Sequence, residues 1–208
     1  MAIVNIQLTE LISQLGMSAV DKLLADFCCE LDSDVECFIR KKAIPFEKND
    51  LSRTYMIFWV DESGEEYEIL AYYSLASKSF CLDGLSKGVQ KRIRGGGQQP
   101  SQKVNAVSCI LIGQIGRNSK SSAYFPSEAL FREIFVSIRA INSAIGTRIF
   151  YLECKDIPKL KAIYESKGFQ LLMNSDGTPY MSSNDGHEYI VYIMTMKQLR
   201  QILIDNKL

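Results

Sequence analysis

Residues 148–169 constrain the fold most, because they predict a strand, a helix and a second strand in immediate succession. The opening part of this segment is rich in aromatic and branched side chains, which suits a buried strand. Asp156 is expected to cap the helix that follows, and Pro158 falls in its first turn, where a missing N–H leaves no hydrogen bond unmade. Gly168 is expected to end the helix in the left-handed conformation, so that Phe169 begins the next strand and packs on the last helical turn.

A second strand and helix lie upstream, with a polar loop between them. Val104–Ile115 is the most continuous apolar strand candidate in the chain. Residues 116–126 are polar and rich in turn formers, and apolar residues then recur at helical spacing as far as Gly146. The N-terminus of this helix presents free backbone amides and the positive end of the helix dipole. It therefore predicts an anion site for a phosphate, to which Arg117 and Lys120 can add charge.

The N-terminal half predicts a helix followed by an antiparallel hairpin. Asp32–Ile44 has a capping residue, early acids, late bases and an apolar stripe. Thr54–Val60 and Tyr67–Leu82 have the pattern of strands, and the polar turn 61–66 that joins them contains a glycine.

Both ends of the chain are expected to be helical. Leu8–Leu15 and Met17–Phe27 have the pattern of two short helices laid over an edge of the sheet, and Met196–Leu208 that of a final amphipathic helix. We therefore expect residues 1–25 to form a helical extension packed on a core domain of residues 26–208.

Composition limits the classes of protein that the chain can represent. With 208 residues, 47% hydrophobic and 23% charged, it can bury one substantial core. Lys plus Arg and Asp plus Glu number 24 each, so no net charge draws the whole protein toward nucleic acid or an anionic membrane. No signal-peptide pattern and no apolar run of roughly 18 residues occurs, which predicts a cytoplasmic protein without a membrane partner. The six cysteines lack C-x-x-C spacing and are expected to be reduced, packed thiols.

Two phrases of the sequence resemble motifs of one enzyme superfamily. Residues 163–169, Ile-Tyr-Glu-Ser-Lys-Gly-Phe, resemble the closing motif of the GNAT superfamily of acetyltransferases, and residues 111–118, Leu-Ile-Gly-Gln-Ile-Gly-Arg-Asn, resemble its cofactor-binding strand. The resemblance covers residues 26–196. It implies a single-domain α/β (α+β) fold with a mixed central sheet of about six to seven strands flanked by helices. It also implies an N-acetyltransferase that uses acetyl-CoA as cosubstrate and no metal, and in which an amine attacks the thioester directly.

The same resemblance implies roles for individual residues. Tyr164, the tyrosine of the closing motif, is expected to protonate the departing CoA thiolate; a core tyrosine at the seam between helix and sheet is the alternative. Glu153 is a candidate general base beside Glu66 and Glu68, although each also suits a surface role and a chain of waters would serve as well. The residues expected to bind the cofactor run from the strand end through the loop: Gln114, Ile115, Gly116, Arg117, Asn118, Ser119, Lys120, Ser121, Ser122, Ala123, Phe125 and Ser127.

The chain departs from the superfamily pattern at two points. The cofactor loop normally reads Q/R-x-x-G-x-G/A, but no glycine lies between Arg117 and Pro126. The asparagine that usually starts the tyrosine-bearing helix is replaced by Ile157. A loop that carries side chains must present its amides differently from a glycine loop.

Other chemistry-bearing patterns are weaker. Residues 113–122 follow a strand and precede a helix as a P-loop does, but the G-x-x-x-x-G-K-[ST] spacing fails. The triple glycine 95–97 does not complete G-x-G-x-x-G.

His187 is the single histidine, which excludes a multi-histidine metal site, and we expect it in a surface turn. Residues 92–102 predict a basic loop that either contacts the acceptor or the CoA 3′-phosphate or serves only as a connection.

Three functions from different classes are compatible with these patterns. The first is an acetyltransferase whose acceptor is a small-molecule or peptide amine, acting as a monomer or homodimer. The second is a toxin that modifies charged tRNA or a protein, against which the zero net charge counts because RNA binding favours a basic protein. The third is a non-catalytic module that binds CoA.

Overall fold

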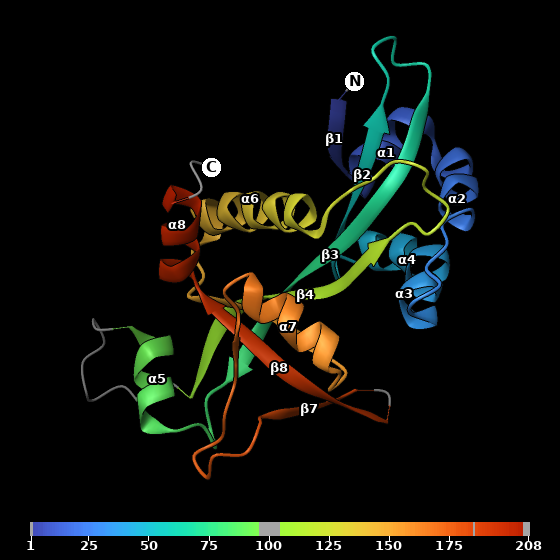
Figure 1. Cartoon of the computed structure of the whole chain (residues 1–208). Helices are drawn as coiled ribbons and strands as arrows, with labels where there is room; N and C mark the ends of the chain where they lie inside the picture. Colours follow the sequence, from blue (N-terminus) through green and yellow to red (C-terminus); the bar gives the residue numbers. More distant parts are fainter. Residues whose placement is uncertain (1, 96–104, 185, 206–208) are drawn as a thin grey trace. The chain divides into compact units, whose positions relative to one another are not determined.

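The computed structural model describes residues 2–95, 105–184 and 186–205, and within them the chain forms an α+β fold around a mixed sheet of eight strands (Figure 1). Hydrogen bonding gives the strand order β1-β2-β3-β4-β5-β8-β6, with β7 paired to β8. The fold class expected from the sequence is confirmed, and the sheet has more strands than the expected six or seven. The strands are β1 (Ala2–Gln7), β2 (Arg53–Val60), β3 (Tyr67–Cys81), β4 (Ala106–Arg117), β5 (Ile149–Cys154), β6 (Gln170–Leu171), β7 (Met181–Asn184) and β8 (His187–Thr195).

Most of the helices lie where the apolar periodicity predicts them; the helix Lys87–Arg94 and the segment after residue 32 differ from the prediction. The helices are α1 (Leu8–Leu15), α2 (Met17–Ala25), α3 (Ser33–Cys37), the π-helix η1 (Phe38–Lys42), α4 (Ala43–Lys48), α5 (Lys87–Arg94), α6 (Ser127–Ile145), α7 (Pro158–Ser166) and α8 (Met196–Asp205). By its internal contacts the chain divides into two compact units, which we describe separately: unit 1 is Met1–Ala76 with Ile112–Ile134, and unit 2 is Ser77–Leu111 with Phe135–Leu208. The predicted division of the chain at residues 25 and 26 stays a prediction.

Unit 1 begins with a strand that the sequence pattern does not predict. β1 pairs antiparallel with β2 from Ala2↔Val60 to Gln7↔Tyr55, and β2 pairs antiparallel with β3 across the expected hairpin (Figure 1). α1 and α2 are the two short helices expected after it, joined at Gly16, and α1 contacts β1 and β2. The buried carboxylate of Glu47 holds this corner together. It accepts hydrogen bonds from the Thr9 hydroxyl at 2.6 Å and from the Thr54 amide at 2.9 Å.

The helical segment after residue 32 is longer than predicted and contains a π-helical turn. The side chain of Asp32 caps α3 by accepting from the Asp34 amide, as expected from the sequence. The helix continues through η1 into α4 and ends at Lys48 rather than Ile44, although Pro45 lies inside α4. Proline cannot donate to the helical ladder and its ring crowds the carbonyl one turn earlier, so the wider π-turn just before Pro45 relieves that conflict.

The core of unit 1 is built around the ring of Tyr72. Tyr72 is fully buried, lies edge-on to Phe27 with ring centroids 5.2 Å apart, and is parallel to Phe38 at 6.3 Å. Its hydroxyl donates to the Val35 carbonyl at 2.6 Å, which ties the sheet to α3. The ring passes so close to Gly116 on β4 that a Cβ there would lie 2.6 Å from Tyr72 Cε1.

Unit 2 is organised by β8, which pairs antiparallel with β5 and β6. It also forms a hairpin with β7 (Figure 1). Its buried core includes Phe80, Ile93 and Tyr151. α7 ends as predicted. Gly168 has a φ of +89°, its amide donates to the Glu165 carbonyl at 2.9 Å, and the Phe169 amide donates to the Tyr164 carbonyl at 3.1 Å. This hydrogen-bond pair is a Schellman motif, which only a residue at ease with positive φ completes.

Two local predictions for unit 2 are wrong. Asp156 does not cap α7; the N-cap residue is Ile157, no side chain caps the helix, and the Asp156 carboxylate instead pairs with Lys161 Nζ at 2.8 Å. Arg92 and Arg94 do not belong to a loop but to α5, which Ser86 caps by accepting from the Val89 amide at 3.3 Å. The remaining part of the predicted loop, residues 96–102, lies outside the described residues.

Within the described ranges, none of the helices has the length and apolar character needed to cross a membrane. The same ranges hold no group of three or more His, Cys, Asp or Glu side chains arranged to bind a metal ion.

Candidate functional site

The predicted cofactor residues gather in unit 1, at the end of β4 and in the loop before α6. Gln114 and Ile115 are half-buried, Gly116 is buried and Arg117 is exposed. The loop then runs from Asn118 to Pro126, directly before the first residue of α6.

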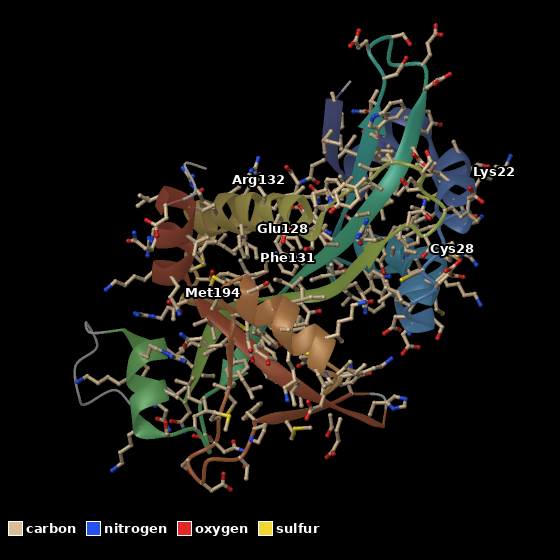
Figure 2. All side chains as sticks on the ribbon, in the orientation of Figure 1. Lys22, Cys28, Glu128, Phe131, Arg132 and Met194 are labelled. Atoms are coloured by element: carbon tan, nitrogen blue, oxygen red, sulfur yellow. The ribbon has the colours of Figure 1, made fainter. Side chains whose placement is uncertain are left out.

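Asn118 organises the start of this loop and uses its whole side chain to do so. Its backbone amide donates to the Leu70 carbonyl at 2.9 Å, and its Nδ2 donates to the Ile69 carbonyl at 3.0 Å. Its Oδ1 accepts from the amides of Cys28 and Lys120, both at 3.2 Å. Cys28, labelled in Figure 2, lies in the segment between α2 and α3. Asn118 therefore links β3, this segment and the loop through hydrogen bonds.

The next loop amides are also occupied. The amide of Ser119 donates to the Cys28 carbonyl at 2.8 Å, and that of Ser121 to the Asn118 carbonyl at 3.2 Å. The amide of Ser122 donates to Glu68 Oε1 at 2.7 Å, and the side chain of Lys120 pairs with Asp26 at 2.5 Å. That ion pair lowers the pKa of Asp26 through a hydrogen bond and charge attraction. The first part of the predicted phosphate loop is thus held by unit 1 itself.

The last part of the loop is where backbone donors stay available. The amides of Ala123, Tyr124 and Phe125 donate to no acceptor in the part of the chain that the structure describes. The Phe125 side chain is buried, whereas Tyr124 is 85% exposed. These amides directly precede α6, whose length of 19 residues gives its N-terminus a full helix dipole.

The first turns of α6 have one polar face. Figure 2 shows Arg132 and Phe131 leaving the helix on opposite sides, in agreement with an exposed Arg132 and a Phe131 that is 3% exposed. The Ser127 hydroxyl donates to the Glu128 carboxylate at 3.2 Å. The carboxylate of Glu128 is favourable for the helix dipole but repels a phosphate. Arg132, one turn later, is the cationic side chain of α6 that lies nearest to the N-terminus of the helix.

The two predicted catalytic residues lie in unit 2. Glu153, on β5, is half-buried, and its Oε1 accepts from the Ser182 hydroxyl on β7 at 2.8 Å. Tyr164 is half-buried in the last turns of α7. Its ring lies edge-on to Phe169 with centroids 6.2 Å apart and tilted to Tyr192 at 5.9 Å. The sequence pattern does not single out Tyr192, because it is one more apolar position of a buried strand.

The cysteines are all free thiols, and two are deeply buried in unit 2. Burial raises the pKa of Cys109 to about 12 and that of Cys154 to about 11. Because the thiolate is the nucleophile, these groups stay protonated and inert at neutral pH. His187 is exposed, as expected, but it is the first residue of β8 rather than part of a turn.

We expect a thiol reagent to distinguish the exposed Cys81 from the buried cysteines. In native protein at pH 8, Ellman's reagent is predicted to label Cys81 first and to reach Cys109 and Cys154 only after unfolding. A thiol pKa of about 11 or 12 instead of about 9 leaves about 100- to 1,000-fold less thiolate. A Cys81→Ser variant is the control. Labelling of Cys109 or Cys154 in the native protein as fast as that of Cys81 would contradict the buried environment described here.

Known proteins resemble this chain in structure rather than in sequence. Neither a family model nor a curated protein matches the sequence. A structure of a tyrosine-to-phenylalanine mutant of KacT matches with a TM-score of 0.68 and 16% identity over 97% of this chain and 99% of KacT. A structure of AtaT complexed with acetyl-methionyl-tRNA matches with a TM-score of 0.65 and 16% identity, over 97% of this chain and 99% of AtaT. AtaTR bound with acetyl-CoA matches with a TM-score of 0.64 and 14% identity, over 97% of this chain and 98% of that one.

KacT and AtaT are acetyltransferases of the GNAT fold. This chain has three features that agree with that likeness. They are its strand order, the helix α6 after the sequence-predicted cofactor strand, and the tyrosine in α7. The chain therefore has the fold of the GNAT N-acetyltransferases.

Proposed function

We propose that the protein is an N-acetyltransferase that transfers an acetyl group from acetyl-CoA to an amine. The observation that carries this proposal is the likeness, over nearly the whole chain, to a structure that has acetyl-CoA bound. Tyr164 supports it, because it lies near the end of α7, where its ring contacts Phe169 and Tyr192. The KacT structure and three AtaT structures carry a tyrosine-to-phenylalanine substitution, the same change that tests Tyr164 in this chain.

The reaction requires positioning and proton handling rather than a covalent intermediate. The amine nitrogen attacks the thioester carbonyl, the C–N bond forms, the C–S bond breaks, and the sulfur leaves as a thiolate. The Tyr164 hydroxyl gives its proton to that thiolate, and the amine proton passes to a base, for which Glu153 or a water chain is available. A backbone N–H of Ile115 or Gly116 is proposed to donate to the carbonyl oxygen as it gains negative charge.

For the cofactor we propose that Gln114–Ser127 hold the pantetheine and pyrophosphate groups, in two different ways. Gln114–Arg117 supply strand backbone, and Asn118–Ser122 shape the loop through their contacts within unit 1. The amides of Ala123, Tyr124 and Phe125 then donate to the pyrophosphate at the N-terminus of α6. The pyrophosphate part of this assignment, residues 118–127, uses no glycine, in agreement with the sequence of the loop.

Replacing Ala123 with proline removes one of these free amides and is expected to weaken acetyl-CoA binding. One hydrogen bond to a charged group contributes about 1.5–3 kcal/mol, so the Kd measured by calorimetry should rise by roughly ten- to a hundredfold. Ser122→Ala is the matched control, since it trims a hydroxyl whose contact to Glu68 is 3.4 Å long and keeps every amide. Equal affinity of Ala123→Pro and wild type would refute the assignment of these amides.

A second candidate for the acceptor is the amine of an aminoacyl-tRNA, in place of a small-molecule or peptide amine. AtaT is seen with acetyl-methionyl-tRNA, and the basic helix α5 of this chain favours a nucleic-acid partner despite the zero net charge. Lys87, Lys91 and Arg92 are exposed on α5, which contains no acidic residue. The guanidinium of Arg148 also lies against Gly95, at the C-terminal end of this helix. Lys and Arg side chains gathered in this way bind phosphodiester backbones.

The two acceptors predict different salt behaviour. If tRNA is the acceptor, affinity for tRNA falls as salt rises, and replacing Lys87, Lys91 and Arg92 with alanine flattens the slope of log K against log salt by about 0.7–0.9 per lost phosphate contact. Lys22→Ala is the control, because Lys22 is an exposed lysine on α2, in the other unit (Figure 2). If tRNA binding is absent or insensitive to salt and acetyl-CoA is consumed on small amines, the acceptor is a small-molecule or peptide amine.

The two acceptor classes are separated by acetyl-CoA consumption on a panel of small amines, peptides and aminoacyl-tRNAs. Tight acetyl-CoA binding with no turnover on any acceptor would instead identify a non-catalytic CoA-binding module. The cytoplasmic location expected from the sequence remains a prediction.

A further inference from the structure

A buried tyrosine on β8 is hydrogen-bonded to the neighbour of Tyr164. Tyr192 has an exposed fraction of 0%, and its hydroxyl donates to Glu165 Oε1 at 2.8 Å. Glu165 itself is an exposed residue of α7, so its carboxylate reaches inward from the surface to the buried hydroxyl. A surface carboxylate in solvent does not need this partner, whereas a buried hydroxyl left unpaired costs free energy. The bond therefore fixes α7 to β8 at the last helical turn.

The backbone of Tyr192 gives this bond a rigid base. Tyr192 lies opposite Leu152 of β5 and opposite Leu171 of β6, so β8 is paired on both sides at this residue. Its neighbours in sequence, Val191 and Ile193, are also buried. A strand paired on both edges moves less than the end of a short helix, so Tyr192 is the fixed partner and α7 the element that is held.

The ring of Tyr192 also contacts Tyr164 directly. The Tyr164 ring lies between two aromatic neighbours, Tyr192 at 5.9 Å and Phe169 at 6.2 Å. The carbonyl of Tyr164 accepts from the Phe169 amide in the Schellman motif. Edge-on and tilted aromatic contacts are directional, so two of them limit the rotation and tilt of the ring between them.

The Tyr192 hydroxyl stays a donor over the whole working range of pH. Burial raises the pKa of Tyr192, and the hydrogen bond to Glu165 and the negative charge of its carboxylate raise it further. A raised phenol pKa keeps the proton on the hydroxyl at neutral and mildly alkaline pH, so the hydroxyl can donate to Glu165 there.

We propose that Tyr192 is a positioning residue for Tyr164: its ring and its hydrogen bond to Glu165 hold the last turn of α7 so that the Tyr164 hydroxyl has one orientation. This inference rests on the proposed function, in which Tyr164 gives a proton to the thiolate. Tyr192 acts only through Tyr164 and the turn that carries it.

The kinetic test is a double-mutant cycle with Tyr192→Phe, which removes the hydroxyl and keeps the ring. Alone it is expected to lower kcat for acetyl transfer by roughly ten- to a hundredfold, the size of effect caused by a misplaced catalytic group, with KM for acetyl-CoA unchanged. Glu165→Ala should show the same loss of kcat. Glu165→Gln keeps an acceptor oxygen and should therefore retain most of the wild-type kcat. In a Tyr164→Phe background, Tyr192→Phe should change kcat by less than about twofold, because the group that it orients is gone. An undiminished additional loss in that background would show a merely structural role and overturn the proposal.

A second readout does not depend on turnover. Protein labelled with 3-fluorotyrosine gives a fluorine NMR signal for Tyr164, assigned by its absence in Tyr164→Phe. Tyr192→Phe is expected to shift or broaden that signal through new ring orientations, and Glu165→Gln to leave it close to the wild-type position. An unchanged Tyr164 signal in Tyr192→Phe overturns the proposal whatever the kinetics show. A changed signal together with a fully active Tyr164→Phe would instead refute the acid role of Tyr164 and leave the positioning contact standing.

Discussion

Replacing Tyr164 with phenylalanine is expected to lower kcat by about 10²–10⁴-fold, the range typical of losing a general acid. The thiolate that leaves acetyl-CoA needs a proton, and phenylalanine has none to give. The ring is kept, so its contacts with Phe169 and Tyr192 survive, and folding and acetyl-CoA affinity should stay at wild-type values. The measurement is steady-state kinetics on a confirmed acceptor, with calorimetry to show that the variant still binds the cofactor.

Two outcomes would change the assignment of Tyr164. A loss of less than about tenfold would mean that water supplies the proton and that the hydroxyl is dispensable. Full activity would make Tyr164 a structural residue of the seam between α7 and the sheet, the alternative that the sequence alone leaves open.

The second large effect is expected at Gly116, where a side chain has no room. A Cβ there would lie 2.6 Å from Tyr72 Cε1 and 2.7 Å from Val35 Cγ1. Neither neighbour can move freely, because the Tyr72 hydroxyl is bonded to the Val35 carbonyl and the ring is packed against Phe27. Gly116→Ala should therefore cost about 1–3 kcal/mol of unfolding free energy, as overpacking does. The melting temperature falls by about 2–4 °C for each kcal/mol lost, so thermal unfolding can measure this effect.

Gly88→Ala provides the control for the Gly116 prediction. Gly88 lies in α5 without positive φ, and a Cβ added there would have no neighbour within 4 Å, so alanine should stabilise the helix by up to about 1 kcal/mol. Thermal unfolding of the two variants should shift in opposite directions. A Gly116→Ala protein as stable as the wild type would contradict the packing of Tyr72 across β4.

The parts of the fold that the sequence predicts correctly are those whose local signals agree with their final contacts. α6 has an unbroken apolar periodicity that ends at Gly146, and α7 ends at Gly168 because a left-handed residue is needed there. β1 is not predictable in this way, because its strand character depends on pairing with β2, some fifty residues away, and none of its side chains is fully buried. Asp156 has the residue type of a cap, yet its carboxylate pairs with Lys161, five residues later, instead.

The candidate site shows the same division between local and long-range information. Tyr164 and the loop 114–127 are identifiable because a short motif and a strand–loop–helix pattern are visible in the sequence. The occupied amides of Ser119 and Ser122 are not predictable, since their acceptors Cys28 and Glu68 lie far away in sequence. Tyr192 escapes prediction for the same reason, because nothing in a run of buried residues indicates that one hydroxyl contacts α7.

The most direct test of acetyl transfer by direct attack is a mass measurement with acetyl-CoA that carries a deuterated acetyl group. Protein, cofactor and a panel of amines that includes aminoacyl-tRNA are mixed, and free CoA, labelled acceptor and protein are followed together. Direct attack predicts one acceptor molecule acetylated per CoA released, no acetyl group on the protein, and a much slower release with Tyr164→Phe. Labelled acetyl accumulating on a cysteine of the protein, or CoA released without any acetylated acceptor, would contradict it.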